Sequence, residues 1–178
     1  MVDSNAEIPD RNKELNLFLQ EFQKESDRGA ALLGAAMIDD YLRRIIVAYL
    51  IDKKRVVDEL LSGGNVPIAT FSARNKVVYC LGLISRCEYF NIDTIRAIRN
   101  RFAHELHGLS FDNKEIVKLC KKLKFDKSGF GIINLASPRH SFTLATAIIL
   151  TNLNKTNVNH LTVKTENDDW EPMRNLKW

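Results

Sequence analysis

The sequence predicts an all-α protein, a single-domain bundle of six to eight helices. Apolar residues recur at helical spacing, no strand-like alternation of apolar and polar residues stands out, and helix-capping patterns precede several segments. The 178 residues fit one domain, and their composition, 45% hydrophobic and 27% charged, excludes wholesale disorder. We expect the domain over residues 1–163 and a polar C-terminal tail over residues 164–178.

Three helices are expected in the first third of the chain. The first spans residues 10–25, where large apolar side chains recur at helical spacing opposite charged ones. The second spans residues 27–50, because Ser26 or Asp27 can cap its N-terminus. The third spans residues 52–61. Four of its apolar side chains are expected to be buried, namely Val56, Val57, Leu60 and Leu61.

The middle of the chain begins with a loop over residues 62–67, which are rich in glycine and end in proline. A helix is expected over residues 71–84. Ser85 with Glu88 forms a capping-box pattern, which predicts a further helix that runs to about residue 106. An interruption of that helix at Asn91 is left open.

Two more helices are expected before the tail. Asp112 with Glu115 resembles another N-terminal cap, for a helix that buries Ile116, Leu119 and Leu123. Proline favours the first helical position, so Ser137-Pro138 predicts the start of the last core helix.

The N-terminus, the apolar runs and the cysteines indicate a cytoplasmic protein. The first fourteen residues are polar and acidic, unlike a secretory signal, and no apolar run reaches the roughly 20 residues that a membrane span needs. Cys80, Cys87 and Cys120 form an odd set without a close pair. We therefore expect core thiols rather than disulfides, and neither a metal site nor a cofactor.

Basic residues are concentrated between residues 86 and 124. This segment has nine Lys or Arg against five Asp or Glu, which accounts for the whole net charge of +4. A local basic excess indicates a phosphate-bearing partner such as RNA, although a solvated lysine-rich face explains it as well. The residues expected to contact RNA phosphates are Arg96, Arg101, His107, Lys118, Lys121 and Lys122.

One short stretch, Arg99-Asn100-Arg101-Phe102-Ala103-His104, contains side chains of types that take part in catalysis. On a helix, Ile92, Ile95, Ile98, Phe102 and Leu106 form one apolar stripe, with Asn100 and His104 on the opposite side. Arg99 lies near the edge of the stripe, where a guanidinium needs an acidic partner or an anionic ligand. Asp39 or Asp40 is the expected partner if the role is structural.

The alternative for this stretch is RNA cleavage without a metal. Histidine titrates near neutrality and can move the proton of a 2′-hydroxyl, and arginine can stabilise the negative charge that grows on phosphorus. Arg99 and His104 are about 140° apart on a regular helix, so they cannot converge within one straight helix. Catalysis therefore requires a loosened helix end near Ala103 or a homodimer with a composite site.

The arginine, the asparagine after it and the histidine five residues later resemble the motif of the HEPN superfamily of small helical bundles. The resemblance implies a metal-independent endoribonuclease, such as a toxin or an anti-phage defence effector, with Arg99, Asn100 and His104 as catalytic residues. It also implies a homodimer and an antitoxin or other regulatory protein as partner.

A second resemblance covers more of the chain, from about residue 27 to residue 153. The successive segments FSARNKVVYCLGLIS, IRAIRNRFAHEL, SFDNKEIVKLCKKLK and SPRHSFTLATAIIL are similar to proteins of the mannitol operon repressor family. This resemblance implies a helical, non-catalytic transcription regulator that works through protein or nucleic-acid contacts. No helix-turn-helix with a basic recognition helix is apparent. We give the nuclease as the leading hypothesis, the regulator as its alternative and a non-cleaving nucleic-acid-binding module as the third.

Overall fold

The computed structural model describes residues 11–50, 53–62, 66–105, 108–125 and 137–159. Within them the chain forms seven helices and no strand, which confirms the predicted all-α class. The predicted boundary between the domain and its tail, and the tail itself, lie outside the described residues.

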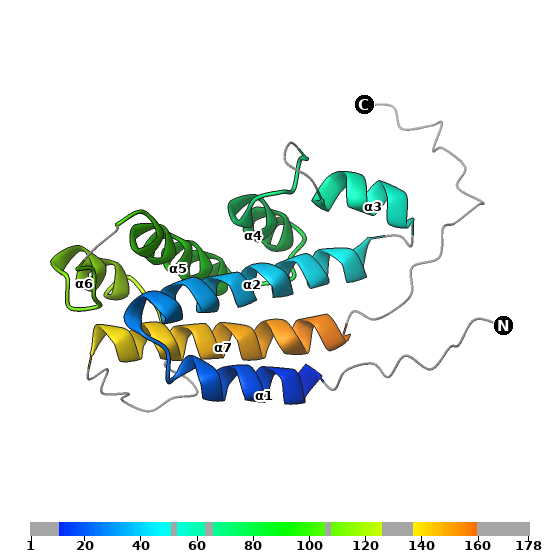
Figure 1. Ribbon diagram of the computed structural model, residues 1–178. Coiled ribbons are helices and arrows are strands. Elements are labelled where there is room, and N and C mark those ends of the chain that lie inside the picture. Colours follow the sequence, from blue (N-terminus) through cyan, green and yellow to red (C-terminus); the bar gives the residue numbers. More distant parts are fainter. Residues whose placement is uncertain (1–10, 51–52, 63–65, 106–107, 126–136, 160–178) are drawn as a thin grey trace.

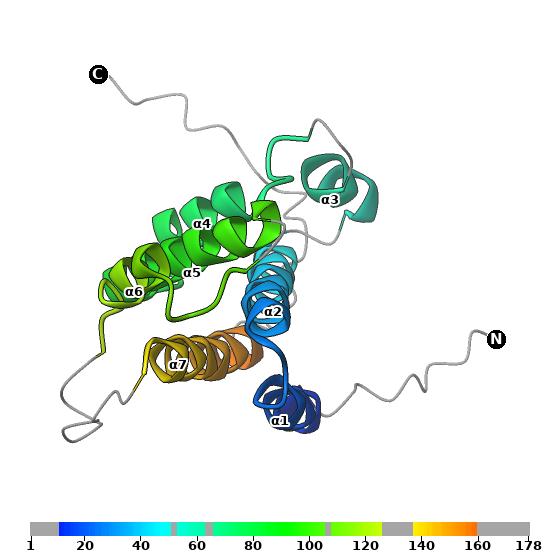
Figure 2. The same cartoon turned by 60° about the vertical axis from the view of Figure 1, so that its left-hand side comes forward.

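Two long helices form the centre of the bundle, α2 (Asp27–Tyr49) and α7 (Pro138–Asn159). They lie side by side and run in the same direction, while α1 (Arg11–Phe22) runs the opposite way along them (Figure 1). The remaining helices are α3 (Lys54–Leu61), α4 (Phe71–Cys80), α5 (Arg86–His104) and α6 (Lys114–Cys120). In both views, α4 and α5 lie on the side of α2 that faces away from α1 (Figure 2).

Small side chains allow this close packing around α2. Ala30, Ala31 and Ala35 are almost completely buried. A Cβ atom added at Gly34 would lie 3.1 Å from the Phe22 ring and equally near Thr146, so glycine keeps space there for α1 and α7. The core continues through the stripe predicted on α5, where Ile92, Ile95, Ile98 and Phe102 are fully buried. Leu106 lies outside the described residues.

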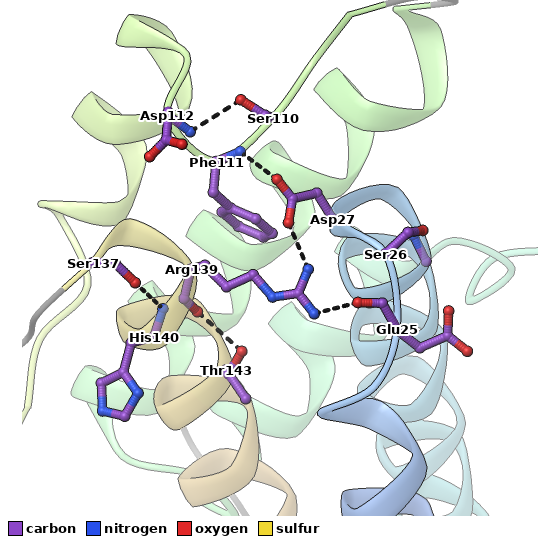
Figure 3. Close-up of polar contacts among 11 residues, drawn as sticks. Glu25, Ser26, Asp27, Ser110, Phe111, Asp112, Ser137, Arg139, His140 and Thr143 are labelled. Atoms are coloured by element: carbon purple, nitrogen blue, oxygen red, sulfur yellow. Dashed lines mark hydrogen bonds and ion pairs between the residues drawn. The ribbon is translucent and has the colours of Figure 1, made fainter.

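A polar cluster joins three segments at one end of the bundle (Figure 3). Asp27, in the first turn of α2, accepts hydrogen bonds from the Arg139 guanidinium at 2.6 Å and from the Phe111 backbone N–H at 2.9 Å. Arg139 also donates to the backbone carbonyl of Glu25 and lies over the Phe111 ring. The starts of α2, α6 and α7 are thereby held together.

Several helix caps confirm the sequence predictions. Ser26 caps α2 by accepting from the Gly29 N–H at 3.0 Å. Both hydrogen bonds of the capping box between Ser85 and Glu88 are present. Pro138 is the first residue of α7.

Other local expectations differ from the structure. α5 is continuous through Asn91, whose buried side chain bonds to the backbone of Lys124 and donates to the Cys87 sulfur one turn earlier. α4 ends at Cys80, short of the predicted residue 84, because Gly82 adopts a left-handed turn with φ of 70°. Asn113, not Asp112, caps α6 by accepting from the Glu115 N–H.

Burial was also mispredicted at several positions. Val56 is 48% exposed, although Leu61 in the same helix is buried as expected. Cys80 is exposed and Cys87 half-buried, so only Cys120 is the buried core thiol that was expected. No helix in the described part of the chain is long and apolar enough to cross a membrane.

Candidate functional site

A polar cleft of about 480 Å³ opens between α2, the start of α4 and the middle of α5. Its walls come from segments that are far apart in sequence. The lining residues are Ala35, Ala36, Asp39, Asp40, Arg43, Thr70, Phe71, Ser72, Arg74, Arg96, Arg99 and Asn100. Arg96, Arg99 and Asn100, which the sequence singled out, therefore lie together in one cleft, which we call the arginine cleft.

Arg99 has no carboxylate partner among the described residues. Its guanidinium is exposed and donates to the neutral Asn100 amide oxygen at 3.1 Å. The expected ion pair with Asp39 or Asp40 is not formed, because each of these carboxylates has another arginine. Asp39 binds Arg74 at 2.7 Å, and Asp40 binds Arg44 at 2.6 Å.

Arg44 does not line the cleft and belongs to an ion-pair cluster that links α1 to α2. It donates to both carboxylate oxygens of Glu14 at 3.0 Å and also binds Asp40. The hydrogen bonds to Glu14 raise the pKa of Arg44 above its ordinary value, although burial opposes this. Arg44 is therefore already paired with two carboxylates.

The other two arginines of the cleft differ in their pairing. Arg96 is held by Asp93, one turn earlier on α5, at 2.7 and 3.0 Å. Arg43 lines the cleft from α2 and forms no ion pair within the described part of the chain. Arg43 and Arg99 are thus the cations of the cleft that lack a compensating charge.

His104 lies apart from this group. It is exposed at the end of α5 and does not line the arginine cleft. The adjacent carbonyl of Glu105 accepts a hydrogen bond from Arg28 at the start of α2. Because α5 is regular up to His104, the helix end does not loosen around Ala103 to bring the imidazole toward Arg99. Within one chain these two groups therefore face different surroundings.

The residues expected to contact RNA phosphates are not gathered in one place. Arg96 lines the arginine cleft, whereas Arg101 pairs with Glu115 at 2.9 Å on an exposed surface. Lys118, Lys121 and Lys122 are exposed on α6 and just after it. His107 lies outside the described residues.

The sequence did not predict four of the polar residues that line the cleft, namely Arg43, Thr70, Ser72 and Arg74. A signal was present on α2, where Asp39 and Arg43 are four residues apart and so share one face. Thr70, which caps α4, follows the pattern of a hydroxyl residue before a helix, and its Oγ1 accepts from the Ala73 N–H at 3.1 Å. No pattern in the sequence predicts that these four residues lie close to α5.

A second candidate surface is aromatic and lies where α4 ends and α5 begins. Tyr79 stacks on Tyr89 with ring centroids 4.6 Å apart, and Tyr89 meets the edge of Phe90 at 5.5 Å. Phe90 is 41% exposed and lies beside two cations, with Arg86 at 5.6 Å and Lys124 at 5.3 Å from its ring. We call Tyr79, Leu81, Arg86, Tyr89 and Phe90 the aromatic patch. Exposed aromatics beside arginine are typical of protein-binding surfaces.

Comparisons with known proteins give two matches. A family described as mannitol repressor (MtlR) matches residues 28–163. A solved structure, that of the MtlR-HPr complex from Escherichia coli, contains a chain that matches with a TM-score of 0.64 at 18% identity. The match covers 79% of this chain and 98% of that one. No curated protein matches the sequence.

These matches confirm one resemblance and correct the leading functional hypothesis. The predicted similarity to the mannitol operon repressor group is confirmed. The prediction of an endoribonuclease, acting as a toxin or defence effector, is wrong, because the matching family is one of repressors. The roles predicted for Arg99, Asn100 and His104 depended on that activity. The separate surroundings of Arg99 and His104 agree with this correction. Membership of the HEPN superfamily stays a prediction.

Proposed function

The chain belongs to the mannitol repressor family, and from this premise we propose that it is a non-enzymatic regulator of transcription that acts by binding another protein. The observation that carries the proposal is the family match over residues 28–163. The fold adds support, since a chain of the same architecture was solved in complex with HPr. We propose that the HPr of the same cell is the partner and that the regulator works in the cytoplasm.

The aromatic patch is the surface that we propose for this contact. Tyr79, Leu81 and Phe90 are each at least 36% exposed, although large apolar side chains are usually covered. Arg86 and Lys124 beside Phe90 give the patch a positive rim. A partner with an apolar centre and acidic groups around it would fit this surface, because the charges would steer it and the rings would supply the buried area.

Titration calorimetry of the full chain with purified HPr tests both parts of the proposal. We expect saturable one-to-one binding, and we expect Phe90→Ala to weaken it at least tenfold, about 1.4 kcal/mol. The matched control is Leu17→Ala, which removes a side chain of 53% exposure from α1, on the opposite side of α2 (Figure 2).

The outcomes separate the partner from the surface. Absence of heat and of complex formation with the wild-type chain would disprove HPr as the partner. Equal weakening by Leu17→Ala and Phe90→Ala would disprove the aromatic patch while leaving HPr in place. The homodimer and an RNA partner stay predictions, and sedimentation of the free chain tests the first of them.

A further inference from the structure

We propose that the arginine cleft binds the phosphate group of a small phosphorylated compound. The cleft has the size of a small-molecule site, since such pockets measure roughly 300 to 1,000 Å³ and this one about 480 Å³. It is separate from the aromatic patch, so the proposal does not depend on HPr as a partner.

The charge of the cleft favours an anion. Four arginines and two aspartates line it, which leaves an excess of two positive charges. Counting the outer partners as well lowers this excess to one, because Arg44 adds one positive charge and Glu14 and Asp93 add two negative charges. Glu14 and Asp93 pair with Arg44 and Arg96, however, and not with the two remaining arginines. The excess resides on Arg43 and Arg99, neither of which has a carboxylate partner among the described residues. A guanidinium binds phosphate through two parallel N–H donors, so both can contribute to one phosphate group.

The start of α4 supplies further donors to the same space. Phe71 and Ser72 line the cleft, and their backbone N–H groups have no acceptor within the described part of the chain. The next N–H, that of Ala73, is already taken by the Thr70 hydroxyl. Free N–H groups in the first turn of a helix bind phosphate well, because the helix dipole adds to their partial positive charge.

An ion pair between α2 and α4 also lines the cleft. Asp39 holds Arg74 through one oxygen, while its other oxygen, Oδ1, is buried without a partner. The Nε–H of Arg74 is likewise buried and unpaired. Because both atoms are buried, this ion pair forms a fixed part of the wall, and Arg43 and Arg99 are the cations left to meet the phosphate.

Calorimetry with the full chain and defined probes tests the cleft. The probes are inorganic phosphate, a hexose phosphate and a hexitol phosphate, each ester compared with its unphosphorylated parent. We expect at least one ester to bind, its parent to bind at least tenfold more weakly, and inorganic phosphate to compete with it. Arg99→Gln and Arg43→Gln should each weaken binding of the ester at least tenfold without lowering the melting temperature.

The matched control is Arg101→Gln, which removes an arginine from the same helix but outside the cleft. It should leave binding of the ester unchanged. Failure of every phosphorylated probe to bind would overturn the proposal. So would equal weakening by Arg101→Gln and Arg99→Gln, because that would indicate attraction to the general positive charge of the protein. Neither outcome bears on HPr binding, which the Phe90→Ala measurement tests separately.

Discussion

The guanidinium of Arg139 lies 2.6 Å from the Asp27 carboxylate, which joins the first turns of α7 and α2 across 112 residues of sequence. Asp27 also receives the Phe111 N–H at 2.9 Å, so one carboxylate serves three segments (Figure 3). Its side chain is 34% exposed and that of Arg139 is 26% exposed. These hydrogen bonds are therefore less exposed to solvent than those of ordinary surface ion pairs.

We expect Asp27→Ala to lower the free energy of unfolding by about 1 to 3 kcal/mol, because it leaves a half-buried guanidinium and a backbone N–H without their acceptor. Urea denaturation followed by circular dichroism measures the change. The control is Arg101→Ala, whose pair with Glu115 is more than half exposed and should contribute within about 0.5 kcal/mol. A loss for Asp27→Ala as small as that of the control would show that the cluster does not hold the three segments together.

Replacing Asn91 should also lower the free energy of unfolding. Its side chain donates to the Lys124 carbonyl at 2.7 Å and accepts from the Lys124 N–H at 2.9 Å, which fixes the chain after α6 against α5. Asn91→Ala should cost about 1 to 3 kcal/mol in unfolding free energy, since both backbone groups lose their partner. Thr94→Ala, on the same helix, removes only a bond to the Phe90 carbonyl one turn earlier and should be nearly neutral. Equal effects of the two variants would contradict this account.

Gly82 should tolerate alanine poorly for a purely conformational reason. Its φ is 70°, a left-handed value that costs an L-residue about 1 to 2 kcal/mol, while an added Cβ would meet nothing within 4 Å. Gly82→Ala should therefore lower the unfolding free energy by about that amount. Gly108→Ala, with φ of 73° and equally open surroundings, should lose a similar amount. An unchanged stability in both variants would refute the role of backbone strain at these turns.

The three cysteines should differ in reactivity. Burial raises the pKa of the Cys120 thiol from 9.0 to about 12, whereas Cys80 is exposed. Since the thiolate is the reactive form, iodoacetamide at pH 8 should modify Cys80 first and Cys120 only after unfolding. Peptide mass spectrometry over time measures the order. If Cys120 in the folded chain were modified as fast as Cys80, this would contradict the burial of the Cys120 thiol.

The same thiol should make stability depend on pH. Above pH 9 the unfolded chain loses the Cys120 proton while the folded chain keeps it until about pH 12. The unfolded state therefore binds fewer protons, and the free energy of unfolding should fall as pH rises from 9 toward 12. Cys120→Ala should show a smaller fall over this range. Parallel curves for the two proteins would contradict the shifted pKa.

Local patterns predicted most helices because local physics is enough to start and to stop a helix. Ser26, Ser85 and Pro138 act within one turn, and the stripe from Ile92 to Phe102 needs only a helical period. Whether α5 breaks at Asn91, which the sequence left open, is decided by a distant contact. Its partner Lys124 is 33 residues away, and no local pattern shows that the asparagine will be buried against it.

The same division holds for the candidate site. By itself the sequence determined the class of fold, the buried face of α5, the resemblance to the mannitol repressor family and the placement of Arg96, Arg99 and Asn100 on one helix. Only the tertiary structure decided that Arg43 and the start of α4 join them, that Asp39 is committed to Arg74, and that His104 stays apart. The physical reason is that an ion pair or a cleft depends on which helices approach each other, and that approach is set by packing around α2 and not by spacing along the chain.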